Sequence, residues 1–313
     1  MILIVNLNLA VDMIVNVNGL QTNRVQRAVS TLRQAGGKGV NAARVLKTLG
    51  ESCSLTGFLG GRSGELVAAG LRAEGIASSC TRIKGESRTC LILNDRKNRQ
   101  QTVVNEPGAQ ISDDEWIDFT HAYERLLINS ELIIITGSLP PGLPADAYAQ
   151  LIHVANRQSK RVLLDSSSDA LREAVSAAPF VVKVNDAEAG ELLNENIGDF
   201  ADAAKATDRL RELGARNALI TLGARGAIFN FENVKYRFVP PKVEIQNSVG
   251  SGDAVIAGLA AGLRRGLSPQ QTGALAVAAG TANALHGMGR CSAGEISEIL
   301  NEVSFCVEET RRD

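Results

Sequence analysis

The chain has 313 residues, with 33 Lys and Arg against 34 Asp and Glu, so its formal net charge is −1. This balance produces no long-range field for nucleic acid or an anionic membrane, and neither partner is expected. No apolar run reaches the roughly 18 residues of a membrane-spanning helix, and the 44% hydrophobic and 21% charged content is that of a globular protein long enough for one large α/β domain.

The cysteine pattern argues against disulfides and zinc. The five cysteines are odd in number and widely spaced, without a C-x-x-C pair. A reducing, cytoplasmic setting is therefore expected. The three histidines have no metal-ligand spacing and are interpreted as structural or surface residues.

The N-terminal part begins with a strand and a glycine-rich turn. Ile2–Leu7 is predicted to be the first strand, because this start lacks the basic flank of a signal peptide. The turn Gly36-Gly37-Lys38-Gly39-Val40-Asn41 leads into a helix predicted over Gly39–Leu49, with Gly50 as its stop.

This turn also fits the loose dinucleotide fingerprint G-x-G-x-x-A. That interpretation fails on context, because Ala28–Gln34 is not a clear buried strand and no acidic residue ends a strand about twenty residues later. A flexible loop with a solvated lysine is one alternative. The other is a glycine-lined substrate wall on which Lys38 and Asn41 face a polyol.

Two segments, Asp12–Val17 and Thr81–Asn105, alternate apolar and polar residues. Turns at Gly85-Glu86 and Asp95–Asn98 divide the second one. This period is typical of a small antiparallel sheet solvated on one face. We expect strands at about 12–17 and 81–105 to form a lid inserted in a single domain of residues 1–313.

Four later apolar runs each end in a polar or glycine-containing turn: Leu132–Thr136, Val162–Asp165, Phe180–Val184 and Ala218–Leu222. Helical patterns alternate with them, one opened by a capping box at Ser112–Glu115 and running to about Leu127. This order predicts a doubly wound, mostly parallel sheet flanked by helices. From Asp253 to about Val303 the chain is predicted to be mostly helical.

Ligands of open α/β sheets bind beyond the carboxyl ends of the strands. Three turns at such ends carry candidate groups. Thr136–Gly142 presents Ser138, Lys183–Glu188 opens a helix, and Thr221–Gly226 is a glycine turn that a nucleotide can approach. No Walker motif is present, so the predicted phosphate site is not of the P-loop kind.

Asn185 and Glu188 are three residues apart and share one helical face. An amide and a carboxylate in this arrangement can hold a hydrated magnesium ion near nucleotide phosphates. Taken alone, such a pair is more often a helix cap. Both interpretations stay open at this point.

The stretch Asn247-Ser248-Val249-Gly250-Ser251-Gly252-Asp253 carries the strongest chemical signal. Its glycines turn the backbone just before an apolar helix start, where free N–H groups and a partial positive charge favour a phosphate. Asp253 would repel that anion and is better placed to accept a proton from an attacking hydroxyl. The simpler alternative is an acidic residue that complements the helix dipole.

Together these motifs resemble the ribokinase-like carbohydrate kinases of the PfkB branch over nearly the whole chain. The Gly-Gly-Lys-Gly turn and Gly252-Asp253 are the two signatures of that family. The resemblance implies ATP and Mg²⁺, with Asp253 as catalytic base and Gly250, Ser251 and Gly252 as the anion hole. It also implies a sugar set of Asp12, Gly37, Lys38 and Asn41, a nucleotide set of Lys183, Asn185, Thr221, Gly223, Gly226 and Ser248, and Glu188 as a magnesium residue acting through water.

Within the family, the loop Gly137–Gly142 is similar to that of hexose-phosphate kinases, which adds Ser138 to the substrate contacts. A substrate that already bears a phosphate needs cations away from the reacting hydroxyl. Arg88 matches that role on the predicted strand Ser87–Leu93, supported by Arg27 and Lys38.

The expected activity is ATP-dependent phosphorylation of a ketohexose monophosphate at its primary hydroxyl, with fructose 1-phosphate, tagatose 6-phosphate and fructose 6-phosphate as candidates. A kinase of an unphosphorylated sugar or nucleoside is an alternative. A catalytically silent sugar-phosphate-binding regulator is another. Pairing of two chains would cover the exposed lid-strand edges, so a homodimer is expected.

Overall fold

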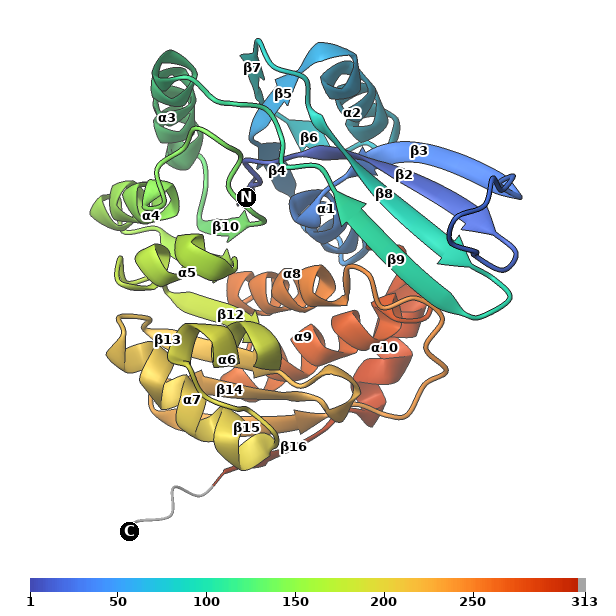
Figure 1. Cartoon of the computed structure of the whole chain (residues 1–313). Helices are drawn as coiled ribbons and strands as arrows, with labels where there is room; N and C mark the ends of the chain where they lie inside the picture. Colours follow the sequence, from blue (N-terminus) through green and yellow to red (C-terminus); the bar gives the residue numbers. More distant parts are fainter. Residues whose placement is uncertain (309–313) are drawn as a thin grey trace.

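A ten-stranded sheet is the framework of residues 1–308, the part of the chain that the computed structural model describes (Figure 1). Across the sheet the strands are β16 (Ser304–Val307), β15 (Val234–Val239), β14 (Ala227–Phe231), β13 (Asn217–Thr221), β12 (Val181–Asn185), β11 (Arg161–Asp165), β10 (Leu132–Thr136), β1 (Ile2–Val5), β4 (Cys53–Thr56) and β6 (Ala77–Ser78). Strands from β6 to β13 pair in parallel, and those from β13 to β16 pair antiparallel. The mostly parallel sheet is confirmed.

Helices cover both faces of this sheet because its central strands are apolar on both sides. In β1, Ile2 and Ile4 belong to one core, and Leu3 and Val5 belong to the other. The first face carries α1 (Lys38–Thr48), α2 (Gly61–Ala73), α8 (Ser251–Arg264), α9 (Pro269–Asn283) and α10 (Ala293–Glu302). The second carries α3 (Asp113–Ile128), α4 (Ala147–Arg157), α5 (Ser168–Val175), α6 (Asp186–Leu193) and α7 (Phe200–Glu212). The doubly wound arrangement is thus confirmed.

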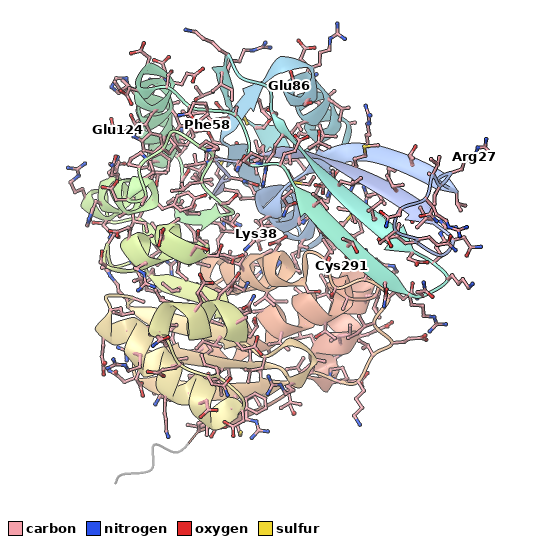
Figure 2. All side chains as sticks on the ribbon, in the orientation of Figure 1. Arg27, Lys38, Phe58, Glu86, Glu124 and Cys291 are labelled. Carbon is pink, nitrogen blue, oxygen red and sulfur yellow. The ribbon has the colours of Figure 1, made fainter. Side chains whose placement is uncertain are left out.

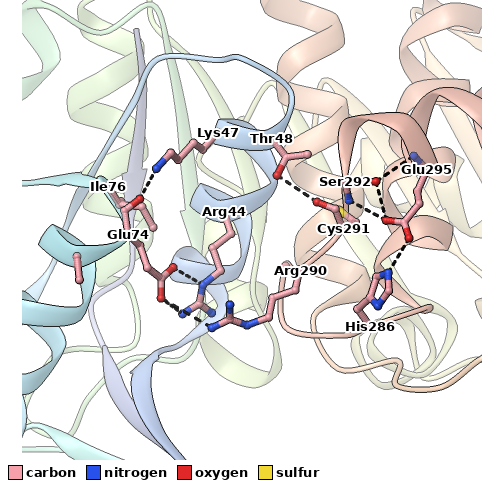
Figure 3. Close-up of a pocket in the computed structure, with 12 residues that line it drawn as sticks. Arg44, Lys47, Thr48, Glu74, Ile76, His286, Arg290, Cys291, Ser292 and Glu295 are labelled. Carbon is pink, nitrogen blue, oxygen red and sulfur yellow. Dashed lines mark hydrogen bonds and ion pairs between the residues drawn. The ribbon is translucent and has the colours of Figure 1, made fainter.

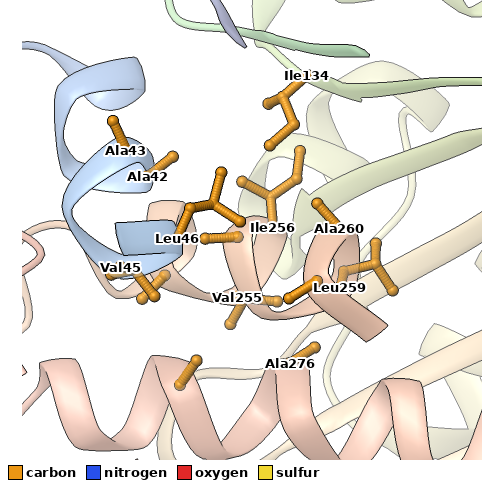
Figure 4. Close-up of a cluster of buried hydrophobic side chains, with 14 of the residues drawn as sticks. Ala42, Ala43, Val45, Leu46, Ile134, Val255, Ile256, Leu259, Ala260 and Ala276 are labelled. Carbon is orange, nitrogen blue, oxygen red and sulfur yellow. The ribbon is translucent and has the colours of Figure 1, made fainter. Parts of the chain in front are cut away.

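Apolar and small side chains allow α8 to pack closely between α1 and α9. Leu46 of α1 lies beside Ile256 of α8, near Ile134 of β10 (Figure 4). On its other side α8 meets α9, where a Cβ at Gly258 would lie 2.7 Å from the Leu275 carbonyl oxygen. This packing fixes the N-terminus of α8, which carries Asp253.

A second, smaller sheet has four strands within the described residues, in the order β3 (Ser30–Gly36), β2 (Ala10–Val17), β8 (Arg88–Asp95) and β9 (Gln100–Asn105). It projects to one side of the large sheet (Figure 1). Its two outer pairs are antiparallel, as predicted, whereas β2 and β8 pair in parallel.

The boundaries of this small sheet differ from the prediction at two points. Strand β3 was not predicted, because its first four residues are exposed and show no apolar alternation. Thr81–Ile83, predicted as the start of the lid segment, forms β7 and pairs with β5 (Phe58–Gly60) in a separate two-stranded sheet. Among residues 1–308, no helix has the length and apolarity needed to cross a membrane.

Candidate active site

Two cavities meet where β12 ends and α8 begins. The first, of about 460 Å³, is lined by Asp253 and by residues of β2, β8 and β9, and we call it the Asp253 cavity. The second, of about 600 Å³, is lined by the turn after β13 and by α9, and we call it the Thr221 cavity. Lys183, Asn185 and Gly252 line both, so the two cavities share a wall.

The first turn of α8 forms part of that shared wall. Gly250 caps the helix with φ +82°, a left-handed conformation that favours glycine. A Cβ at Gly252 would lie 2.7 Å from Lys183 Nζ, so only glycine lets the ammonium group come this close. Helix-start N–H groups lack helical acceptors, and with an ammonium beside them they form a site for an anion.

Asp253 lies within this first turn and is only 5% exposed. Asn41 Nδ2 donates a hydrogen bond to Asp253 Oδ2 at 2.9 Å. Burial raises the pKa of Asp253 to about 6, while Lys38 opposes the rise and Asp165 adds to it. The carboxylate is therefore ionised at neutral pH and able to accept a proton.

The Gly36-Gly37 pair lets β2 meet the start of α1. A Cβ at Gly36 would lie 2.1 Å from the carboxyl group of Asp12, and Gly37 has φ +110°. Asp12 is buried, and burial raises its pKa to about 6 against the lowering effects of Arg44 and Arg88. Gly36 thus leaves room for the Asp12 carboxyl group, and Asp12 lines the Asp253 cavity together with Lys38 and Asn41.

A buried carboxylate joins the two lysines of the site. Asp165 Oδ1, at the end of β11, lies 3.3 Å from Lys38 Nζ and 3.4 Å from Lys183 Nζ. Burial favours a higher pKa, but Lys183 and then Lys38 hold the pKa of Asp165 below its usual value. In turn, Asp165 is the main cause that raises the pKa of Lys38. Both lysine side chains are therefore held in position by the same carboxylate.

Sequence reasoning did not select Asp165. The available signal was its position as the last residue of the predicted strand Val162–Asp165, the place where α/β sheets present ligand groups. Asn6 was also missed. Asn6 lines the Asp253 cavity and is 1% exposed, and among residues 1–308 its Nδ2 has no hydrogen-bond partner.

Asn185 and Glu188 form a capping box at the start of α6. Asn185 Oδ1 accepts a hydrogen bond from the Glu188 N–H at 2.7 Å, and Glu188 Oε2 accepts one from the Asn185 N–H at 2.9 Å. The helix cap predicted as one alternative is thus present in the structure. The other carboxylate oxygen, Glu188 Oε1, lies 3.7 Å from Lys38 Nζ, and Glu188 lines the Asp253 cavity. A hard oxygen donor of this kind fits Mg²⁺.

Arg88 and Ser138 are both held by Asn8. The Arg88 Nε donates to the Asn8 carbonyl at 3.1 Å, and its Nη1 donates to the Glu106 carbonyl at 3.2 Å. The Asn8 Nδ2 donates to Ser138 Oγ at 3.2 Å. A strand of the small sheet and a turn of the large sheet are thus tied together at the Asp253 cavity.

The structure gathers the predicted residues around these cavities, with one exception. The residues that line one or both are Asp12, Gly37, Lys38, Asn41, Arg88, Ser138, Lys183, Asn185, Glu188, Thr221, Gly223, Gly226, Ser248, Gly250, Ser251, Gly252 and Asp253. The exception is Arg27, which is exposed in the connection between β2 and β3, at the outer end of the small sheet (Figure 2). Arg27 therefore does not line either cavity within the single chain, and its role in substrate binding stays a prediction.

Comparisons with known proteins identify a family and similar folds. The family described as "pfkB family carbohydrate kinase" matches residues 2–291. Phosphofructokinase-2 from Escherichia coli in its tetrameric inhibited form is 28% identical, with a TM-score of 0.90 over 96% of this chain and 98% of that chain. The same enzyme in complex with fructose-6-phosphate is 27% identical, with a TM-score of 0.88 over the same shares. Ribokinase from Arabidopsis thaliana, complexed with ribose and ATP, is 18% identical with a TM-score of 0.77 over 96% and 98%, which shows that the two share a fold.

Proposed function

Because the chain belongs to the pfkB family of carbohydrate kinases, we propose that it transfers the terminal phosphoryl group of ATP to a primary hydroxyl of a ketohexose monophosphate. The product is the sugar bisphosphate. The observation that carries this proposal is the shared wall of the two cavities, with Asp253 on the side of the Asp253 cavity. Two substrates bound on either side of Gly252 and Lys183 meet at the start of α8.

In this mechanism ATP occupies the Thr221 cavity and the sugar phosphate occupies the Asp253 cavity. Asp253 takes the proton of the attacking hydroxyl group, a contribution of ~10²–10⁴-fold for a positioned base. The first-turn N–H groups of α8 and the Lys183 ammonium stabilise the charge on the transferred group, and one such donor contributes about 3 kcal/mol. Asn41 and Lys38 hold the acceptor hydroxyl groups against Asp253.

Magnesium would be held by Glu188 and Asn185 through water and by the ATP phosphates, and it would supply charge neutralisation for the phosphoryl group. The carboxylate oxygen of Glu188 that its capping bond leaves free is the donor that supports this assignment. Lys38 and Lys183 act beside it as fixed cations through their shared contact with Asp165.

The choice of a phosphorylated sugar rests on the cations of the Asp253 cavity. Arg88 is held at two of its nitrogens by backbone carbonyls, so its guanidinium is preorganised for a second anion. Lys38 lies in the same cavity. The related phosphofructokinase-2 from Escherichia coli was solved with fructose-6-phosphate, which agrees with a phosphorylated hexose as substrate.

The test is a panel of acceptors with ATP and Mg²⁺, followed by ADP release. Fructose 1-phosphate, fructose 6-phosphate and tagatose 6-phosphate are compared with fructose, ribose and adenosine. We expect kcat/KM for one hexose phosphate to exceed that of every free sugar by about 10²-fold, because free sugars leave the site's cations without an anion. A preference for a free sugar or nucleoside would contradict the proposed substrate, and tight binding without turnover would indicate a regulator.

We also propose a homodimer formed through the small sheet. Leu32, Ile14, Ile92 and Val103 are successive cross-strand neighbours, so they form an apolar row across all four strands. The two ends of the row are open, with Leu32 52% and Val103 45% exposed. A second copy would cover both ends and the edge strands β3 and β9.

A further inference from the structure

We propose that Arg44 is a positioning residue, which fixes the side-chain amide of Asn41 and thereby the orientation of the Asp253 carboxylate for proton transfer. Arg44 lies on α1, one helical turn after Asn41, and sequence reasoning did not select it. The inference rests on the proposed phosphoryl transfer, with Asp253 as its base.

The guanidinium of Arg44 is held from several sides. It is 7% exposed, and its Nε and Nη2 donate to the two carboxylate oxygens of Glu74 at 2.7 and 2.8 Å. Nη2 also donates to the Ala35 carbonyl at 2.8 Å, and Nη1 donates to the Met288 carbonyl at 3.2 Å. These acceptors come from the end of α2, from β3 and from the loop before α10. The guanidinium plane is therefore fixed independently of Asp253.

The remaining contact of Arg44 determines the orientation of the Asn41 amide. Arg44 Nη1 donates to Asn41 Oδ1 at 3.1 Å, and Asn41 Nδ2 donates to Asp253 Oδ2 at 2.9 Å. A guanidinium has no acceptor, so only the amide oxygen can face it. The amide nitrogen must then face Asp253. If the amide rotated by half a turn, an oxygen lone pair would oppose the carboxylate.

Other charged groups also act on Asp253. Lys38 of α1, Asp165 of β11 and Lys183 of β12 influence its pKa, and Asp12 of β2, Arg88 of β8 and Glu188 of α6 line the same cavity. Arg44 lowers the pKa of Asp12 directly, but it acts on Asp253 through the Asn41 amide. Removal of Asn41 should therefore remove the effect of Arg44 on Asp253.

A third cavity, of about 870 Å³, makes this idea testable. It is lined by Arg44, Glu74, Arg290 and His286, among others, and it lies beside α1 and the loop before α10 (Figure 3). In an Arg44→Ala variant, this cavity gives guanidinium ions from solution a path to the vacated position. Chemical rescue by guanidinium is a readout that a loss of packing alone would not give.

We expect Arg44→Ala to lower kcat about tenfold, the range for loss of one hydrogen bond to a charged group, with less than about twofold change in the KM for ATP. The acidic limb of the pH profile should move up by about one pH unit, because a turned Asn41 amide favours the protonated carboxyl group. Millimolar guanidinium should restore both kcat and the position of the acidic limb. Arg264→Ala is the matched control, since Arg264 pairs with buried Glu51 at the far end of α8, and it should show neither the pH shift nor the rescue.

A double-mutant cycle separates positioning from packing. In an Asn41→Ala background, the added Arg44→Ala substitution should change kcat by less than about twofold. A full tenfold loss in that background would overturn the proposal, as would a pH shift no larger than that of Arg264→Ala. If Arg44→Ala does not fold, Arg44→Lys, which keeps the charge without the planar fork, should show the same pH shift at smaller size. The absence of any shift in Arg44→Lys would also overturn it.

Titration of the Asp253 carboxyl group by ¹³C NMR, without substrates, distinguishes failure of this inference from failure of the proposed function. Asp253→Asn assigns the resonance. A higher Asp253 pKa in Arg44→Ala than in the wild-type protein supports the positioning role even if no sugar phosphate is turned over. An unchanged pKa overturns it even if the kinase activity is found.

Discussion

The Asp253 carboxylate experiences two opposing influences. Its place in the first turn of α8 favours the negative charge, whereas burial raises its pKa to about 6. The carboxylate is therefore charged at neutral pH and still basic enough to accept a proton from an attacking hydroxyl group. Asp12, on the facing sheet, has a pKa raised by burial to about the same value.

Asp253→Asn should lower kcat by ~10²–10⁴-fold, the contribution of a positioned base, because the amide keeps the shape of the carboxylate without its basicity. Binding of the sugar phosphate, measured by calorimetry, should change by less than about threefold. Asp169→Asn is the control, since Asp169 is an exposed acidic residue in the first turn of another helix, α5. Turnover near the wild-type rate in Asp253→Asn would rule out its role as the base.

The raised carboxyl pKa values give a defined pH dependence. Asp253 must be ionised to accept a proton, so kcat/KM should be constant above about pH 7 and should fall below about pH 6, where the carboxyl group is protonated. If Asp12 must also be ionised, the limb falls about a hundredfold per pH unit, and Asp12→Asn reduces that slope to tenfold. A rate that stays level to pH 4.5 would contradict this assignment.

At the scale of elements, the spacing of apolar residues predicted helices and strands of the large sheet, and the polar turns after the strands predicted where the site residues lie. The capping box at Ser112 is present, and α3 ends at Ile128, one residue beyond the predicted end. Strand β3 was missed because its pairing with β2 comes from backbone hydrogen bonds and not from apolar alternation. Arg27 lies in the exposed connection between β2 and β3 and does not line the cavity of the single chain, a position that its residue type does not reveal. Asp165 and Arg44 were not predicted because most of their partners are distant in the sequence: Asp165 contacts Lys38, and Arg44 contacts Glu74 and Met288.

Arg88 of β8 provides a prediction for the small sheet. Arg88→Ala should raise the KM for a hexose phosphate by about 10²-fold, because the charged hydrogen bonds between the guanidinium and the substrate phosphate are lost. The KM for a free sugar should change by less than about twofold. Steady-state kinetics with both acceptors checks this. Arg82→Ala on β7 serves as the control, because Arg82 is exposed and belongs to a separate sheet. An equal effect of Arg88→Ala on both acceptors would mean that the substrate phosphate lies elsewhere.

At the scale of the whole molecule, the large sheet has a helical layer on each face, whereas residues of the small sheet line the Asp253 cavity and its edge strands are β3 and β9. Its apolar row reaches solvent at Leu32 and Val103. Exposed edge strands with apolar residues can pair with a strand of another chain. A dimer through this sheet would place two Asp253 cavities close to one interface.

Leu32→Glu should therefore shift the protein from dimer to monomer, since a charge buried in an apolar interface is strongly unfavourable. Sedimentation velocity at several concentrations measures the change. Ile128→Glu, at an exposed position at the end of α3, should leave the assembly unchanged. A wild-type protein that is monomeric at high concentration would contradict the dimer.

The shared wall of the two cavities has a stereochemical consequence. Because Gly252, Lys183 and Asn185 border both spaces, donor and acceptor oxygens can face each other across one phosphorus atom without a phosphorylated side chain between them. Such a single displacement inverts the configuration at phosphorus, whereas two successive displacements through the protein retain it. Chirally labelled ATP should accordingly yield a sugar bisphosphate of inverted configuration.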